Sequence, residues 1–428
     1  MKKSVLILVA AILFSHIKLS AAEDITIDLA RLFSKDIFEL NGLPYLQPLV
    51  ETMNATSNSR FFNQAFVPQK VDKPYFRFGV HSMLGFVRDD MKTYNPAMPA
   101  EQLDPNKLSN YIEFSLIPPS LKSIKDTTGL IYYALKTILY DGVADGSIII
   151  PKEAATVLGY KQEKFHLPND TLLALIERNP AYSLLPKEMQ DSILTIIKGF
   201  PETFTLPEGA NMSSLIAAVP QFEIGSFYGT ELLIRFIPPV NMGKNIGDFA
   251  FWGFGLKHSI SQYFLDNPNG SAKEREFDLA FQVVYQGTHL ENTVGVTNAE
   301  LKADATFWNF NLQASKSFDF GMDIYTGLSY ETVNINSQYK YLLPQETQAQ
   351  LGLLRTDKDE NGHIIYIYPA EPPEYPGDTN PQLAKMKFDD QNIKFTLGVA
   401  KQIGPINIFV DYNISKFNIF TGGIEYRF

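Results

Sequence analysis

The sequence predicts a mainly β protein, a transmembrane antiparallel β-barrel of ten strands, with twelve to fourteen strands as the alternative. Three observations support this. Apolar and polar side chains alternate along many short segments, one such segment ends at the last residue, Phe428, and aromatic residues make up 13% of the chain. Because side chains alternate between the two faces of a strand, a one-sided apolar pattern fits a barrel whose outer face meets lipid.

The alternation places the strands. In the segment 249–258, one face carries Trp252, Phe254 and Leu256 and the other carries Gly253, Gly255 and Lys257. A tilted membrane strand needs about 9–11 residues. Counting back from Phe428 predicts strands near 416–428, 405–414, 388–402, 319–335, 299–315, 275–288, 247–262, 229–238, 218–226 and 75–87. If Asn110–Leu116 found a partner strand, the count would rise to twelve.

The amino-terminus has the three parts of a secretory signal peptide. Lys2 and Lys3 precede the apolar run Val5–Phe14, and small residues follow at Ser20–Ala22. The run is too short to span a membrane as a helix. We therefore expect residues 1–22 to be cleaved and the chain to lie in the outer membrane of a double-membraned bacterium. The alternative is an N-terminal membrane anchor.

Composition excludes several classes of function. The chain has no cysteine, which excludes thiolate-ligated metal sites and disulfides. Its net charge of −10 disfavours nucleic acid as a partner, because the phosphate backbone would be repelled.

Two regions do not alternate. Residues 23–73 precede the barrel, which occupies 74–428, and are expected to plug its lumen; the alternative is a disordered periplasmic tail. Residues 119–215 form an insertion with helical spacing in Thr128–Tyr140, Asp170–Arg178 and Lys187–Lys198. If the last strand ends in the periplasm, counting the strands backwards from it places this insertion and the long loop 336–387 outside the cell and the short turns in the periplasm.

Charged residues recur on the face opposite the apolar one, so they are expected to point into the lumen. We single out as lumen or ligand candidates Arg77, His81, Glu231, Arg235, Lys257, Asp323, Glu425 and Arg427. The same face carries Asp278, Glu331, Lys394 and Asp411. These groups form either a polar conduit or ligand site, or a salt-bridge network that holds a closed barrel together.

Asp357–Gly362 places oxygen-bearing side chains at alternating positions before a glycine, as a calcium loop does. The acid expected at the twelfth position is replaced by Tyr368, so we favour a hairpin that turns at Asn361–Gly362. No catalytic motif is present: the sequence contains neither G-x-S-x-G nor H-E-x-x-H. We expect no enzymatic activity, no catalytic residues, no cofactor and no metal.

Three segments carry a resemblance: Pro220–Gly225 with Gly229–Pro238, Gly253–His258, and Tyr45–Phe66. Through them the chain resembles an uncharacterised family of bacterial outer-membrane barrels, a domain of unknown function, which brings no activity with it. More remotely, the layout of a plug before a barrel is similar to the long-chain fatty-acid transporter family, with Phe62–Ala65 as a faint likeness to its plug.

The expected function is passive passage or capture of a small, hydrophobic molecule, collected by the apolar insertion and oriented by Arg77, Arg235 and Lys257. The expected partners are outer-membrane lipids, the barrel-insertion machinery, which would read the terminal Tyr426 and Phe428, and the small hydrophobic ligand. The alternative is a non-transporting surface anchor whose loops 88–217 and 336–387 form a binding or adhesion platform.

Overall fold

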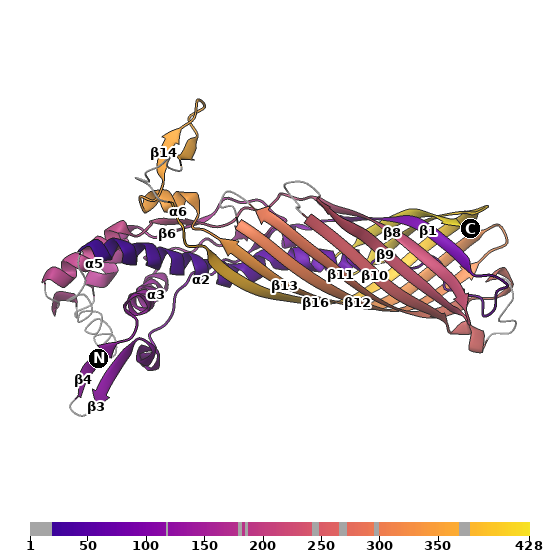
Figure 1. Cartoon of the computed structure of the whole chain (residues 1–428), viewed down its shortest axis with the longest axis horizontal. Helices are drawn as coiled ribbons and strands as arrows, with labels where there is room; N and C mark the ends of the chain where they lie inside the picture. The colour runs from indigo at the N-terminus through magenta and orange to yellow at the C-terminus, as the bar shows by residue number, and fades with distance from the viewer. Residues whose placement is uncertain are drawn as a thin grey trace.

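The computed structural model describes residues 19–116, 119–178, 182–184, 187–241, 248–264, 272–294, 299–367 and 377–428. Ten strands in these residues form a closed antiparallel barrel, ordered β1-β18-β17-β16-β13-β12-β11-β10-β9-β8, with β8 pairing back to β1 (Figure 1). The predicted fold class is therefore confirmed, with ten strands. They are β1 (Tyr75–Phe86), β8 (Ser214–Phe227), β9 (Thr230–Asn241), β10 (Asp248–Ser259), β11 (Asp278–Val294), β12 (Ala299–Ser317), β13 (Met322–Tyr341), β16 (Gln382–Ile403), β17 (Ile406–Ile414) and β18 (Ile419–Arg427).

The two ends of the barrel differ. At one end, tight turns join β8 to β9, β12 to β13 and β16 to β17, and the chain ends there at Phe428. Tyr228 and Gly229 both have positive φ, the backbone that a two-residue hairpin needs. The connection from β10 to β11 at this end is longer and contains 3₁₀ turns at Ser261–Tyr263 and Ala272–Glu274. We call this the short-turn end.

The outer face of the barrel is apolar and bounded by aromatic side chains. Toward the opposite end of the barrel, which we call the far end, Tyr285 lies 5.4 Å from Trp252 and 4.5 Å from Trp308, measured between ring centroids. At the short-turn end, Phe428 stacks 5.9 Å from Phe76 and 6.0 Å from Tyr426. Two aromatic levels around an exposed apolar band are the arrangement of membrane barrels. No helix in the described residues is long and apolar enough to cross a membrane.

Four neighbouring strands are much longer than the rest. β11, β12, β13 and β16 have 17, 19, 20 and 22 residues, whereas β17 and β18 have 9 each. β13 continues to Tyr341 and β16 begins at Gln382, so both exceed their predicted bounds and the connection between them is shorter than 336–387. This wall therefore extends well past the opposite side of the barrel.

A cap of helices and short strands covers the far end (Figure 1). Its centre is α2 (Leu19–Ser57), a single helix that contains Pro44 and Pro48 and enters the barrel. The predicted insertion helices are present as α3 (Thr127–Asp145), α4 (Asn169–Glu177) and α5 (Lys187–Gly199). The remaining elements are β2 (Thr93–Tyr94), β3 (Ile112–Leu116), β4 (Pro119–Ile124), β5 (Ala154–Ala155), β6 (Lys164–His166), β7 (Thr203–Thr205), α6 (Gln345–Gln350), β14 (Arg355–Lys358), β15 (Ile364–Ile367), and 3₁₀ turns at Asp89–Met91, Pro105–Asn110 and Tyr182–Leu184.

Two expectations about local structure are settled by these elements. β3 pairs with β4 in a hairpin outside the barrel, so Asn110–Leu116 adds no barrel strand and the alternative of twelve to fourteen strands is wrong. Asp357–Gly362 lies in the hairpin of β14 and β15, as favoured, although its turn is centred on the Asp359 carboxylate, which accepts from the backbone N–H of Asn361 and of His363. Of the expected signal peptide, residues 1–18 lie outside the described residues.

Candidate functional site: a filled lumen beneath an apolar cap

The N-terminal segment occupies the lumen. α2 ends at Ser57 inside the barrel, and the chain continues through Phe61 and Phe62, which are 1% and 4% exposed, toward the short-turn end. There the Gln64 side chain donates to the Ser317 hydroxyl at 2.9 Å, and the Ser226 hydroxyl donates to the carbonyl of Pro68. Gly327 leaves room for this path, because a Cβ on it would lie 2.5 Å from the ring of Phe62.

Two buried cations of the wall hold the C-terminal end of α2. The Arg235 guanidinium donates to the carbonyls of Ser57 at 3.1 Å, Ser59 at 2.8 Å and Arg60 at 2.5 Å. Lys394 donates to the carbonyl of Asn58 at 2.6 Å. The last carbonyls of a helix lack partners and carry its negative dipole end, so cations stabilise it there.

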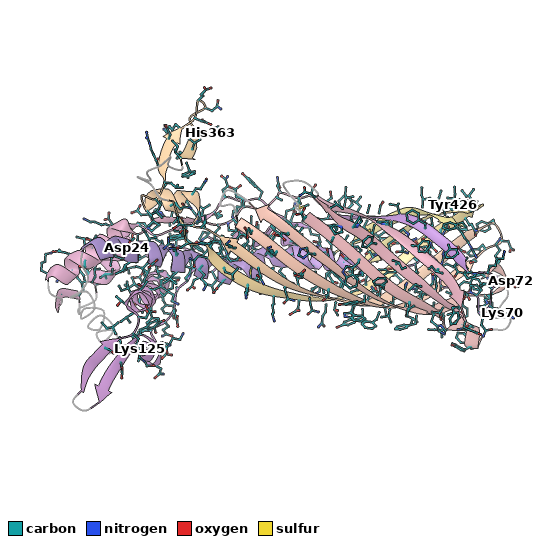
Figure 2. The ribbon with its side chains drawn as sticks, in the orientation of Figure 1. Asp24, Lys70, Asp72, Lys125, His363 and Tyr426 are labelled. Atoms are coloured by element: carbon teal, nitrogen blue, oxygen red, sulfur yellow. The ribbon has the colours of Figure 1, made fainter. Side chains whose placement is uncertain are left out.

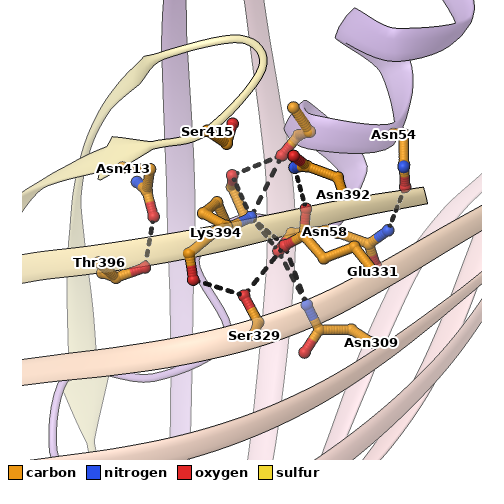
Figure 3. A network of polar contacts seen from close by, with 12 residues as sticks. Asn54, Asn58, Asn309, Ser329, Glu331, Asn392, Lys394, Thr396, Asn413 and Ser415 are labelled. Atoms are coloured by element: carbon orange, nitrogen blue, oxygen red, sulfur yellow. Dashed lines mark hydrogen bonds and ion pairs between the residues drawn. The ribbon is translucent and has the colours of Figure 1, made fainter. Parts of the chain in front are cut away.

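These two cations differ in their other partners. Lys394 also pairs with Glu331, which accepts from Asn309 and Asn392 (Figure 3). Arg235 is fully buried, and apart from the carbonyls it donates to the amide oxygens of Gln221 at 2.8 Å and Gln286 at 3.5 Å and stacks over Phe61. Within the described residues, no carboxylate pairs with Arg235, so its charge is balanced by the helix end itself.

A second buried cluster surrounds Glu231. Its carboxylate accepts from the Tyr75 hydroxyl at 2.7 Å, pairs with Lys257 at 2.5 Å, and contacts Arg77. Arg77 also pairs with Glu223 at 2.9 Å. These ion pairs tie the four strands β1, β8, β9 and β10 together inside the lumen.

A third cluster joins the wall to the plug. His81 lies between the Glu425 carboxylate, at 3.1 Å from Nε2, and the Arg60 carbonyl, at 3.1 Å from Nδ1. Glu425 accepts from the Asn63 side chain at 2.5 Å. The Arg60 guanidinium pairs with Asp411 at 3.1 Å and lies 3.4 Å from the ring centroid of Phe409.

Six of the eight candidate residues are therefore brought together in the lumen, namely Arg77, His81, Glu231, Arg235, Lys257 and Glu425. Asp323 is half-buried near the short-turn rim, and Arg427 is exposed there, with its guanidinium 4.5 Å from the ring centroid of Tyr75. Sequence reasoning missed the plug partners of Arg235, His81, Lys257 and Glu425, which lie between Ser57 and Gln64. An irregular segment has no alternation that would show which way its side chains point. The short polar and aromatic run around Phe62 was the one signal available.

Outside the barrel, α2 is fixed to the cap by polar contacts. Arg31 pairs with the buried carboxylate of Asp378 at 2.8 Å. Tyr132 of α3 donates to Asp36 at 2.8 Å, and burial together with this carboxylate raises the pKa of Tyr132 well above its usual range. Burial also raises the pKa of Tyr45 to about 12, and its hydroxyl donates to the Glu208 carbonyl at 2.8 Å. These tyrosines therefore stay neutral donors at ordinary pH.

An apolar cavity of about 70 Å³ lies where α2 meets the cap helices. Apolar side chains dominate its lining, which consists of Leu29, Ile131, Ala134, Leu135, Ile138, Ile176, Tyr182, Ile193, Ile196, Ile197 and Phe200. It is about half the size of a ~150 Å³ apolar protein cavity that holds benzene. It suits a small apolar molecule or part of an apolar chain.

The barrel wall is interrupted between β8 and β9. Their pairing ends at Gln221 and Arg235, although β8 begins at Ser214 and β9 continues to Asn241. Three prolines lie at the interruption, Pro220 in β8 and Pro238 and Pro239 in β9, and proline has no N–H to donate to a ladder. Residues 214–220 pair with β1 and residues 236–241 with β10, but the two segments do not pair with each other, and we call them the β8–β9 seam.

The seam is apolar on both sides. On the inner side, Leu215, Ala217, Ile237 and Phe249 pack around buried Val219 and Phe251, and Leu49 of α2 lies against them. On the outer side, Ile216 is 77% exposed and Phe236 is 56% exposed. Phe236 pairs with Trp252, which belongs to the aromatic level near the far end. The seam therefore begins where the apolar band meets the far end of the barrel.

Comparisons with known proteins find a matching family and solved structures that resemble this one. The model of a family described as "Family of unknown function (DUF6588)" matches residues 1–428. Among curated proteins, none matches the sequence. The structure is similar to a Pseudomonas aeruginosa FadL homologue (11% identity, TM-score 0.23, covering 88% of this chain and 97% of that one) and to Ail, the attachment invasion locus protein of Yersinia pestis (10% identity, TM-score 0.21, covering 42% and 83%).

Proposed function

Because the chain belongs to the DUF6588 family, which has no known function, we propose a role from its own geometry: it is an outer-membrane barrel that transfers a small apolar molecule between its cap and the membrane through the β8–β9 seam. The role is a non-enzymatic one. The observation that carries the proposal is the seam, a proline-bounded interruption of the wall that is apolar inside and out.

The filled lumen directs the route sideways. A molecule that moved straight through the barrel would have to displace Phe61, Phe62 and the ion-paired side chains around them. An apolar molecule has no interactions that would compensate for breaking buried ion pairs. At the seam it displaces only apolar contacts, and it meets lipid directly on the outer side.

Closing the seam tests this route. The chain has no cysteine, so an introduced pair is the sole pair of thiols. Continuing the register of Gln221 and Arg235 places Ala218 opposite Pro238, and we expect Ala218→Cys/Pro238→Cys, bridged by a reducible bifunctional thiol reagent, to slow uptake of the apolar dye N-phenyl-1-naphthylamine by whole cells at least fivefold. Reduction of the bridge should restore uptake.

The matched control bridges the same two strands where they are already paired. Phe222 and Ile234 are direct partners in the ladder, so bridging Phe222→Cys/Ile234→Cys should leave dye uptake unchanged. Equal slowing by both bridges, or no slowing by the seam bridge, would contradict the seam route.

A second role, a surface anchor with a binding platform, is favoured by a different observation. The hairpin of β14 and β15 stands away from the barrel and exposes Ile364 and Ile365 (Figure 2, beside His363). This role predicts that cells with and without the chain take up the dye equally, and that deleting residues 355–367 changes surface binding but not uptake.

Filling the cap cavity should abolish capture of a small apolar molecule. Ala134 lines the cavity, so Ala134→Phe places a ring in it. At about ten times its dissociation constant, xenon, which is smaller than benzene, should stabilise the parent protein by about 1.4 kcal/mol. We expect this stabilisation, measured as a shift in the thermal unfolding midpoint, to be absent in Ala134→Phe and unchanged in Tyr140→Phe, which alters an exposed side chain of the same helix. A shift of equal size in both variants would show that xenon binds elsewhere.

A further inference from the structure

The outer face of the long wall changes from apolar to polar at the same level in four strands. The pairing of β11, β12, β13 and β16 aligns their residues in rows across the wall. One row within the apolar band consists of Val283, Phe310, Tyr330 and Ile393. Only every second row faces outward. Three outward-facing rows further toward the cap, the aligned residues are His289, Asp304, Asn336 and Lys387. The next outward-facing row has Glu291, Lys302, Gln338 and Lys385.

The polar rows lie outside the hydrocarbon layer but next to it. β16 has 22 residues, about twice the 9–11 that a membrane strand needs, so roughly half of it projects beyond the apolar band. The rows are continuous with the lipid-facing surface on the same strands. Whatever layer covers the hydrocarbon at this end is therefore in contact with them.

Most of the ionisable side chains on this face are paired with one another, and two lysines are not. His289 pairs with Asp304 at 2.7 Å, Lys302 with Glu291 at 2.7 Å, and Lys340 with Glu300 at 3.9 Å. Lys385 and Lys387 are exposed, and no acid of the described residues lies within ion-pair distance of either. Asp389, also exposed, is the acid nearest to them along β16.

We propose that this polar wall is a binding surface for phosphorylated lipid headgroups of the outer leaflet, with Lys385 and Lys387 as the residues that contact the phosphate. The side chains around them suit such a headgroup, because the amides of Asn336 and Gln338 lie beside the lysines and can donate to phosphate and sugar oxygens. The lysines supply the charge that these amides lack. The surface is independent of the seam and of the cap cavity.

The test uses the full chain, freed of lipid in a neutral detergent and titrated with phosphatidic acid or with phosphatidylcholine, with bound lipids counted by native mass spectrometry. A lysine near an anionic lipid surface contributes about 1 kcal/mol, or roughly fivefold in affinity. We expect the parent protein to prefer phosphatidic acid and Lys385→Gln/Lys387→Gln to lose at least tenfold of that preference. The preference should also fall in about 1 M salt, where charges are screened within ~3 Å.

Two further variants separate headgroup binding from a general effect on the barrel. Asp389→Asn removes a negative charge beside the lysines and should raise the preference for phosphatidic acid, opposite in sign to the lysine variants. Lys358→Gln, on the β14 hairpin, removes an exposed lysine away from the wall and should change nothing. The proposal is overturned if the double lysine variant keeps the parent preference, or if Asp389→Asn lowers it as well.

Discussion

Replacing Glu231 with glutamine should lower the free energy of unfolding by about 3–5 kcal/mol, the usual cost of removing one partner from a buried ion pair. Glu231 is 2% exposed, and its carboxylate neutralises the charge of Lys257 and part of the charge of Arg77. Glutamine keeps the shape of the glutamate side chain and an oxygen that accepts from Tyr75, so the loss of stability reports the effect of the removed charge. Arg77 keeps Glu223, whereas Lys257 is left without a carboxylate partner.

The measurement is urea unfolding of the folded barrel in lipid vesicles, followed by the fluorescence of its two tryptophans. Glu291→Gln is the matched control, because it breaks the pair with Lys302 on the exposed outer face, where both side chains are nearly half exposed. Surface pairs contribute about 0–1 kcal/mol. Equal destabilisation by the two variants would mean that the lumen is hydrated and that the buried network is not what stabilises the barrel.

Replacing Arg235 with methionine should release the plug from the wall. The variant removes the donor that the carbonyls of Ser57, Ser59 and Arg60 share. Gln286 still donates to the Ser57 carbonyl and His81 still contacts the Arg60 carbonyl, so the Ser59 carbonyl is the one that loses its side-chain donor, and a buried group left unsatisfied costs about 1–3 kcal/mol. Because Arg235 bonds to the plug rather than to a wall carboxylate, we expect the cost to fall on the plug. Amide hydrogen exchange of residues 55–63 should rise by at least a hundredfold, while exchange in the barrel strands stays unchanged.

Two further variants test the role of Arg235. Arg235→Lys keeps the charge and one donor group, so it should restore part of the protection. Arg427→Met removes a lumen candidate that turned out to be exposed at the rim, so exchange in residues 55–63 should be unaffected. Unchanged protection in Arg235→Met would show that the plug is held by its apolar contacts alone.

Alternation predicted the barrel well because lipid imposes one rule along its whole outer face. Residues such as Phe310 and Leu312 must be apolar there, while neighbours such as Asn311 face a polar lumen. The alternation between lipid-facing and lumen-facing residues could therefore be recognised in a single sequence. The same rule explains where the prediction ended too early. Beyond Tyr330 and Ile393 the outer face of the wall is polar, the alternation disappears, and β13 and β16 appeared shorter than they are.

The plug and the seam depend on pairings that a sequence does not display. Nothing in the order of residues indicates that Arg235 meets the end of α2 rather than an acid, because the lumen-facing position is the same in both cases. The prolines at 220, 238 and 239 were visible, but only the register, continued past Gln221 and Arg235, places Pro220 opposite Phe236 and thus two residues from Pro238 on the neighbouring strand. The cap cavity required the assembly of four helices, which helical spacing alone does not arrange.

The N-terminal segment runs through the barrel from the cap to the short-turn end and so fills the lumen, and we infer that the cap lies outside the cell and the short-turn end in the periplasm. Asp24 lies in the cap, as does Lys125, and Lys70 lies at the short-turn end (Figure 2). In this cysteine-free chain, Asp24→Cys and Lys125→Cys should react with a membrane-impermeant maleimide on intact cells, and Lys70→Cys only after the outer membrane is permeabilised. Labelling of Lys70→Cys on intact cells, or failure of Asp24→Cys to react there, would contradict the account.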